Sequence, residues 1–226
     1  MTPKTKSTHS LPAKSVLTLI GDVEIYNPKY LIDGIIEESS LVGLIGPSGA
    51  GKTTIVRHLL AKFPNLSFSI SATTRPIRGT EVNGHDYYFI SKEEFLHKVA
   101  KHEFAEFEEV YAGTYYGTLV KEIQRIWSED KQVVFDLDVQ GGLRLKKKFG
   151  ANALAIFVMP PSVEVLAERL SDRATDSPAK IEERMAKAKI ELSFAKDFDI
   201  TLPNNELSVA CAQAEKIVSD FLNKKD

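Results

Sequence analysis

The sequence predicts an α/β fold in which a mostly parallel sheet is flanked by helices. From residue 40 onward, short apolar runs alternate with segments of helical period, as strands joined by helical crossovers do. The first of these runs, residues 41–46, ends in glycine and leads through a glycine-rich loop into a helical segment, residues 53–63. That order places the loop at the carboxyl end of a strand, where α/β sheets bind their ligands.

Composition sets limits on the class of protein. The chain has 226 residues, of which 43% are hydrophobic and 27% charged, so it can bury a core of its own. A net charge of −2 provides no general attraction to nucleic acid or anionic membrane. The single cysteine, Cys211, can form no internal disulfide, and no apolar run approaches the ~20 residues of a membrane span. We expect a cytoplasmic monomer or homodimer without nucleic-acid or membrane partners.

The chain divides into three parts. Residues 1–14 are polar and interrupted by prolines, which predicts a disordered tail. Residues 15–39 carry enough alternating apolar side chains for one or two short strands closed by an Asn27-Pro28 turn, and we assign this extension no function. Residues 40–226 form the main domain.

Each element of the main domain follows from its apolar period. Short runs rich in Val, Ile, Leu and Phe predict buried strands, at 41–46, 66–71, 132–137, 154–159 and about 198–202. Apolar residues spaced three and four apart predict helices, at 53–63, 92–101, 118–128, 140–148, 162–171, 180–196 and 206–223.

Two segments interrupt this alternation. Residues 73–117 are rich in Arg, Gly, Tyr and Glu, and we interpret them as an inserted lobe that binds a substrate. Residues 171–182 are polar and basic without apolar anchors, which is typical of a mobile lid.

The glycine-rich loop carries the strongest motif in the chain. Residues 46–53 satisfy G-x-x-x-x-G-K-[ST] between a strand and a helix, the pattern of a phosphate-binding loop. Backbone N–H groups and the helix dipole would hold phosphate oxygens, with Lys52 at the β- and γ-phosphates. The motif predicts an ATP site made of Gly46, Pro47, Ser48, Gly49, Ala50, Gly51, Lys52, Thr53 and Thr54.

A magnesium site is expected beside this loop. The Thr53 hydroxyl should bind Mg²⁺, and the strand at 132–137 delivers Asp136 near its carboxyl end. Strands often end in Asp for reasons of turn geometry, so Asp136 indicates a metal site only in combination with the loop.

A second cationic site is indicated by Arg75 and Arg78. Because Pro76 breaks the segment, these two residues cannot form an ordinary helix face, and their guanidinium groups suit a second phosphate. Taken alone, the pair is better interpreted as solvated surface arginines. The segment 71–89, however, resembles the GMP-binding signature of guanylate kinases. Three further motifs do so in the expected order, AEF…TYYGT (105–118), DLDVQG (136–141) and RLSDR…EER (169–184).

The resemblance runs from about residue 40 to the C-terminus and implies the P-loop (phosphate-loop) kinase fold. It also implies ATP-dependent phosphorylation of GMP, and of dGMP, with Mg²⁺. It implies that the GMP phosphate is held by Arg75, Arg78, Tyr87 and Tyr116, and that guanine is read by Ser71, Glu106, Thr118 and Asp138. It also implies that the ATP phosphates are contacted by Lys52, Arg169, Arg173 and Arg184, and the adenine by Asn204.

The chain departs from the family pattern in three places. The segment after Glu106 is one residue longer, so Tyr115 could take the role given to Tyr116. Ala174 stands where a glycine usually follows the lid arginine, and Asn205-Glu206 replaces a usual pair of aspartates. Glu106 could also be one more solvated acid of its run, with Glu108 or Glu109 as the alternative base reader.

The expected chemistry needs no general base. The second pKa of a phosphomonoester is about 6, so the phosphate of GMP is mostly a dianion at neutral pH and is itself the nucleophile. Two other functions remain possible. A scaffold domain that has lost catalysis should lack the phosphate-loop lysine, and a sugar-phosphate kinase of the same fold should lack the base-reading residues.

Overall fold

The computed structural model describes residues 40–172 and 178–224. The expected tail at 1–14, the strands expected within 15–39, and Arg173 therefore lie outside the described residues. The described part belongs to one compact unit, Ile36–Asp226. Within that part, no helix has the length and apolar character needed to cross a membrane.

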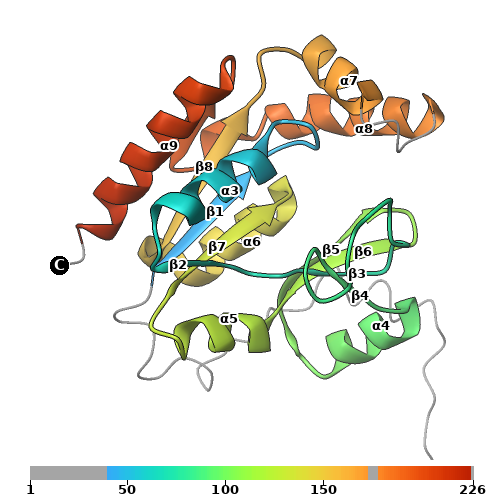
Figure 1. Cartoon of the computed structure of the whole chain (residues 1–226). Coiled ribbons are helices and arrows are strands. Elements are labelled where there is room, and N and C mark those ends of the chain that lie inside the picture. The colour runs from blue at the N-terminus through green and yellow to red at the C-terminus, as the bar shows by residue number, and fades with distance from the viewer. Residues whose placement is uncertain (1–39, 173–177, 225–226) are drawn as a thin grey trace, which may run out of the picture. The chain divides into compact units, whose positions relative to one another are not determined.

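The main sheet has five parallel strands in the order β2-β7-β1-β8-β9, which confirms the predicted α/β class (Figure 1). The strand that precedes the phosphate loop is central, with later strands on both sides, so the loop leaves the sheet where ligands bind in such folds. The strands are β1 (Leu41–Ile45), β2 (Leu66–Phe68), β7 (Gln132–Leu137), β8 (Ala153–Met159) and β9 (Ile200–Pro203).

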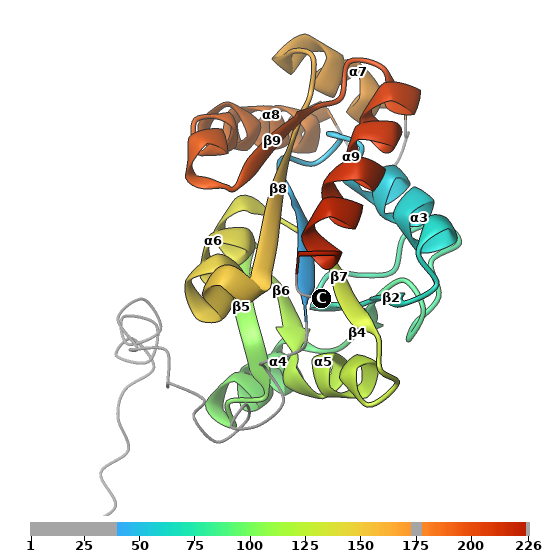
Figure 2. The same ribbon diagram turned by 90° about the vertical axis from the view of Figure 1, so that its left-hand side faces the viewer.

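Helices cover both faces of this sheet. Figures 1 and 2 show α3 (Lys52–Lys62) and α9 (Leu207–Leu222) side by side on one face, with α6 (Val139–Phe149) on the other. The remaining helices are α5 (Val120–Trp127), α7 (Val163–Asp172) and α8 (Pro178–Leu192), with short 3₁₀ turns at Gly150–Asn152 and Ala195–Asp197.

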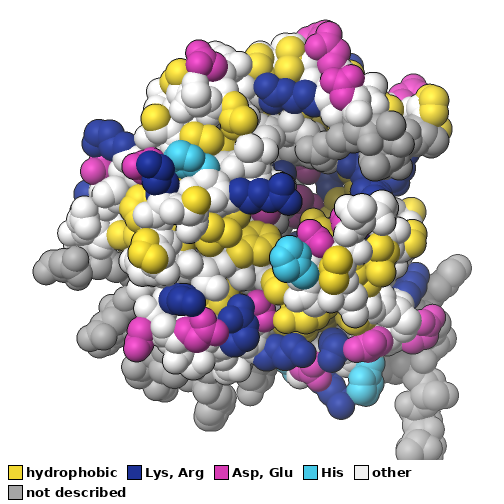
Figure 3. Space-filling view, viewed as in Figure 1, with side chains coloured by type: hydrophobic (Ala, Val, Ile, Leu, Met, Phe, Trp, Pro, Cys, Tyr) yellow, Lys and Arg dark blue, Asp and Glu magenta, His cyan; other side chains and the backbone are white. Residues whose placement is uncertain are grey.

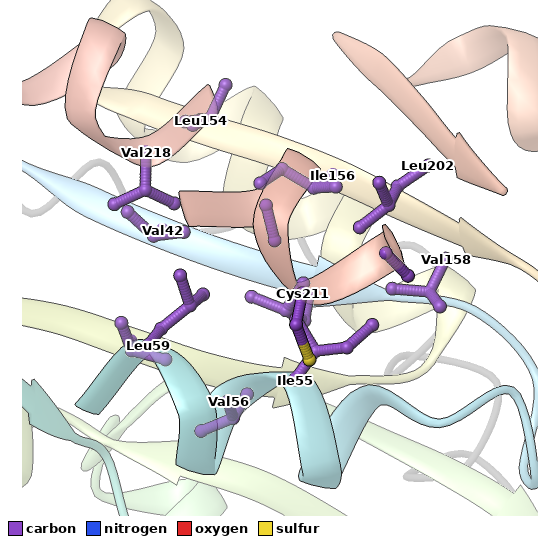
Figure 4. Close-up of a cluster of buried hydrophobic side chains, with 14 of the residues drawn as sticks. Val42, Ile55, Val56, Leu59, Leu154, Ile156, Val158, Leu202, Cys211 and Val218 are labelled. Atoms are coloured by element: carbon purple, nitrogen blue, oxygen red, sulfur yellow. The ribbon is translucent and has the colours of Figure 1, made fainter. Parts of the chain in front are cut away.

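The core beneath α3 and α9 follows from the sequence pattern. Buried residues of α3 recur at helical spacing, Ile55, Val56 and Leu59, and pack against strand residues such as Val42 and Ile156 (Figure 4). Cys211 of α9 lies in this cluster as a small apolar residue. This packing fixes the start of α3, and with it the phosphate loop.

The inserted lobe contains a sheet and a core of its own. Its four strands lie in the order β4-β3-β6-β5, with only β3 and β4 parallel. Phe95 is fully buried and packs with Phe104, Tyr115 and Leu119. The elements of the lobe sheet and its helix are β3 (Ala72–Thr73), β4 (Tyr88–Phe89), α4 (Lys92–Ala100), β5 (Phe104–Tyr111) and β6 (Thr114–Leu119).

Several predicted bounds are wrong. The helix expected at 118–128 begins at Val120, because Thr118 and Leu119 complete β6 and pair with β5. The strand expected at 66–71 ends at Phe68, where the chain leaves the main sheet for the lobe. Likewise, the helix expected at 180–196 ends at Leu192, and the strand expected at 198–202 spans Ile200–Pro203.

Candidate active site

The phosphate loop joins β1 to α3 and needs glycine at two points. Gly46 has φ +139° and Gly51 has φ +96°, values that side-chain-bearing residues rarely adopt. A Cβ on Gly46 would also lie 2.8 Å from the Val158 carbonyl oxygen. Lys52 Nζ donates to the carbonyl oxygens of Gly46 (2.7 Å) and Pro47 (3.1 Å), so its ammonium lies over its own loop.

Asp136 of β7 meets the loop from the neighbouring strand. Thr53 Oγ1 donates to Asp136 Oδ2 at 2.6 Å, and Lys52 Nζ lies 3.5 Å from Asp136 Oδ1. The structure thus brings together the hydroxyl and carboxylate that the sequence suggested for Mg²⁺. Oxygen donors of this kind, few in number and completed by phosphates, suit that ion.

Two residues from distant parts of the chain contact the same loop, and a third contacts one of these two. Arg184 of α8 is buried and donates through Nη1 to Ser48 Oγ at 2.7 Å. Asn204 is buried after β9, and its Nδ2 donates to the Ala50 carbonyl at 2.7 Å. Arg169 of α7 donates weakly to the Asn204 carbonyl at 3.5 Å. Two of the three predicted lid arginines therefore lie at this site, and the third lies outside the described residues.

In the inserted lobe, the guanidinium group of Arg75 is fixed by hydrogen bonds to Glu81 and Tyr116. It is buried, its Nη1 and Nη2 donate to the two carboxylate oxygens of Glu81 at 2.6 Å, and its Nε donates to Tyr116 Oη at 3.1 Å. The centroid of the Tyr87 ring lies 4.8 Å from the guanidinium carbon of Arg75. The hydrogen bonds from Arg75 hold the pKa of Glu81 below its usual value. Glu81 also accepts the Arg78 backbone N–H at 2.9 Å, so it shapes the whole arginine turn.

The pleat of β6 separates the two adjacent tyrosines. Tyr115 is buried and its ring centroid lies 5.4 Å from that of Phe95, on the core side. Tyr116 points the opposite way, towards Arg75, on the same side of the strand as Thr118. The extra residue noted in the sequence falls in a segment where the β5–β6 register shifts, between Glu109 and Tyr111.

Glu106 and Asp138 form a carboxylate cluster, in which Glu106 is buried and Asp138 is partly exposed. Glu106 of β5 pairs with Thr118 of β6, and Thr118 Oγ1 donates to Glu106 Oε1 at 2.7 Å. Asp138 caps α6 by accepting the Gly141 N–H at 2.8 Å. A Cβ on Gly141 would lie 3.0 Å from Glu106 Oε2 and 3.1 Å from Asp138 Oδ1, so both carboxyl groups face one small space. Burial, together with the charge of Asp138, raises the pKa of Glu106 to about 7.

The other sequence-predicted positions lie near these groups. Ser71 immediately precedes β3, and its carbonyl accepts the Tyr88 N–H at 2.9 Å. Thr54 lies in the first turn of α3, where its N–H donates to the Gly51 carbonyl at 3.2 Å. Glu108 forms an ion pair with Arg144, and Glu109 Oε1 accepts the Gly113 N–H at 2.7 Å. Of the three acids, Glu106 is the one whose side chain enters the cluster.

Sequence reasoning missed Glu81 and Lys187. Lys187 Nζ of α8 lies 3.2 Å from Asp138 Oδ2, and no short motif signals that contact. For Glu81 the sequence did contain a signal: an acid six residues after Arg75 can reach that arginine if the chain between them forms a turn. The spacing alone did not identify the pair.

Figure 3 shows a hollow between α8 and the inserted lobe, with Lys, Arg, Asp and Glu side chains on its walls. A phosphate loop on one side and a second held cation on the other are the parts with which phosphate-loop kinases bring two anions together. The chain belongs to the guanylate kinase family, whose sequence model matches residues 38–221.

Individual relatives agree with this assignment. A guanylate kinase of Bacteroides thetaiotaomicron is 48% identical over 185 residues, covering 82% of this chain and 91% of its own length. One from Porphyromonas gingivalis is 46% identical over 187 residues, covering 82% and 100%. The crystal structure of guanylate kinase from Anaplasma phagocytophilum superimposes with a TM-score of 0.65 at 28% identity, covering 83% of this chain and 86% of its own.

Proposed function

We propose that this protein transfers the γ-phosphoryl group of ATP to GMP, and to dGMP, giving ADP and the nucleoside diphosphate. The proposal includes cytoplasmic action on small molecules alone, as a monomer or homodimer. The observation that carries the choice of acceptor is the buried Glu106, with Thr118 on its Oε1 and Asp138 beside it. Carboxylates facing one small space suit a base edge with several N–H donors, and guanine presents these at N1 and N2.

The same cluster accounts for discrimination between purines. Adenine has an acceptor at N1, which would stand opposite a buried carboxylate and leave it unpaired, at substantial cost in binding. The hydroxyl groups of Thr118 and Ser71 are proposed to donate to guanine O6, for which the Thr118 O–H must turn away from Glu106 Oε1. For the GMP phosphate we propose Arg75, Arg78, Tyr87 and Tyr116, with Tyr116 preferred to Tyr115 because only the former lies beside Arg75.

On the donor side, Lys52 and the loop N–H groups would bind the ATP phosphates. Lys52 must then leave the carbonyls of Gly46 and Pro47. Thr53 and Asp136 are proposed to hold Mg²⁺, which when bound neutralises charge on the donor phosphates. Arg169, Arg173 and Arg184 are proposed to act over the transferring group, with Asn204 near the adenine.

A phosphate oxygen of GMP attacks the γ-phosphorus, and the bond from that phosphorus to the β,γ-bridging oxygen breaks. ADP leaves with the electron pair, and no protein base is needed because the nucleophile is already a dianion. The residues of the chain therefore act by holding two polyanions in line and excluding water, which would otherwise compete for the phosphoryl group.

A coupled assay with ATP and Mg²⁺ tests the proposal by offering GMP, dGMP, AMP, UMP and ribose 5-phosphate in parallel. We expect turnover with GMP and dGMP and little with the other three. Turnover of ribose phosphate in place of GMP would indicate a different acceptor class. No turnover with any acceptor, under conditions in which a known guanylate kinase is active, would indicate a non-catalytic binding domain.

A further inference from the structure

Lys187 of α8 contacts a carboxylate of the site, a strand of the inserted lobe and an acid of its own helix. Its Nζ lies 3.2 Å from Asp138 Oδ2, donates to the Val110 carbonyl of β5 at 3.3 Å, and lies 3.5 Å from Glu191 Oε1. It also lies 5.3 Å from the centroid of the Tyr111 ring. With 24% of its side chain exposed, this cation is largely enclosed by the groups it contacts.

The contact with Asp138 fixes a carboxylate of the acceptor site. One oxygen of Asp138 accepts the Gly141 N–H and the other accepts Lys187 Nζ, so the plane of the group is held from both ends. Each carboxylate oxygen keeps a further lone pair that a ligand N–H can use. Lys187 also places a positive charge beside Asp138, one of the two carboxyl groups that share one space and repel one another.

The same turn of α8 also contacts the donor side. Arg184 precedes Lys187 by three residues and so lies on the same face of the helix, where it donates to Ser48 Oγ at 2.7 Å. One helical turn therefore touches both the phosphate loop and the carboxylate proposed to read guanine. A shift of α8 away from Asp138 would also move Arg184 relative to the loop.

We propose that Lys187 is a positioning residue of the acceptor site. It orients the Asp138 carboxylate towards the base edge of the acceptor. This role rests on the proposed phosphorylation of GMP, and the family resemblance gave this lysine no role.

The test compares Lys187→Met with Lys189→Met, a matched loss of one lysine from an exposed position two residues further along the same helix. Since a hydrogen bond to a charged group is weakened, kcat/KM for GMP should fall about tenfold in Lys187→Met. The preference for GMP over IMP, which lacks the N2 amine, should fall about threefold, because Asp138 is no longer fixed. The KM for ATP should stay within about twofold, and Lys187→Arg should recover most of the loss.

Wild-type constants in Lys187→Met would overturn this role. So would equal losses with GMP and IMP, which would indicate that Lys187 only packs α8, or a similar loss in Lys189→Met, which would indicate a general charge effect. Thermal unfolding of each variant identifies any loss of folded protein. The wild-type arm is separate: if it fails to phosphorylate GMP, the proposed function itself is wrong.

Discussion

At Glu106, replacing one carboxylate oxygen by an amide nitrogen should be enough to impair the recognition of guanine. Glu106→Gln keeps the shape of the side chain but removes the charge and places an amide donor where only acceptors are wanted. Because bonds to charged groups contribute about 1.5–3 kcal/mol, kcat/KM for GMP should fall roughly ten- to two-hundredfold, with the KM for ATP nearly unchanged. Steady-state kinetics with both substrates measures this effect.

Glu103→Gln is the matched control, because Glu103 lies three residues earlier and pairs with Lys98 at the surface. It should behave as the wild type. Retention of full GMP efficiency by Glu106→Gln would remove this residue from base recognition. Glu108 or Glu109 would then be tested in its place.

The raised pKa of Glu106 predicts a pH dependence of GMP binding. Burial favours the protonated form, so this group stabilises the unliganded protein most below its usual pKa and loses that contribution as pH rises through about 7. Since Glu106 is proposed to accept N–H groups of guanine in its ionised form, kcat/KM for GMP should rise between about pH 6 and pH 8. The second ionisation of the GMP phosphate, with a pKa of about 6, contributes to the same rise.

The profile of Glu106→Gln isolates the contribution of the phosphate, since that variant has no carboxyl group to titrate. Subtracting its profile from that of the wild type should leave a transition near pH 7. Identical profiles in the two proteins would show that Glu106 is ionised throughout this range.

At the residue scale, the sequence predicted which residues belong to the site better than it predicted the contacts between them. The phosphate-loop motif pointed to Lys52 and Thr53, and the apolar strand at 132–137 pointed to Asp136. The structure places these three side chains together. The sequence could not foresee that Glu81 would hold Arg75, or that Lys187 would reach Asp138. The first contact depends on the path of the chain through a turn, and the second depends on where a distant helix lies. Neither can be deduced from a short sequence pattern.

At the scale of elements, the phosphate loop tolerates little change at Gly51. Its φ of +96° is strained for any L side chain, and a Cβ there would run into the Asn204 amide. Gly51→Ala should therefore lower stability by about 1–3 kcal/mol and reduce ATP affinity, because the loop must distort. Thermal unfolding and titration with an ATP analogue measure the two effects.

Gly113→Ala provides the control for backbone strain alone. Gly113 has φ +74° in the β5–β6 turn, but nothing lies within 4 Å of an added Cβ. Gly113→Ala should lower the stability by about 1 kcal/mol and leave ATP binding intact. Equal losses in both variants would show that the Asn204 contact contributes nothing at Gly51.

The strands of the inserted lobe were not predicted, for a physical reason. β3 and β4 have two residues each, too few to show a period of two. In β5 the sequence FAEFEEVY mixes acids with aromatic residues. Glu106 is buried at a position where a strand pattern would carry an apolar residue, so the period is hidden. The long apolar strands of the main sheet were predicted because burial on both faces leaves little room for other residue types.

On the scale of the whole molecule, the inserted lobe should lose order separately from the main domain. Phe95→Ala removes the ring at the centre of the lobe core, a change that typically costs about 3–5 kcal/mol. GMP binding should weaken severely while an ATP analogue still binds, because the core beneath α3 and α9 is untouched. Calorimetry with each ligand distinguishes this outcome from equal loss of both, which would mean that the two cores unfold as one.

The division of the acids proposed to read the base between two segments bears on how acceptor preference can be altered. Glu106 and Thr118 belong to the lobe sheet, whereas Asp138 caps a helix of the main domain and is held by α8. A chimaera that received only the lobe of a relative with another preferred base would keep half of the original recognition surface. In such an engineered enzyme, or over evolutionary time, a new acceptor would require coordinated substitutions on both sides of the hollow.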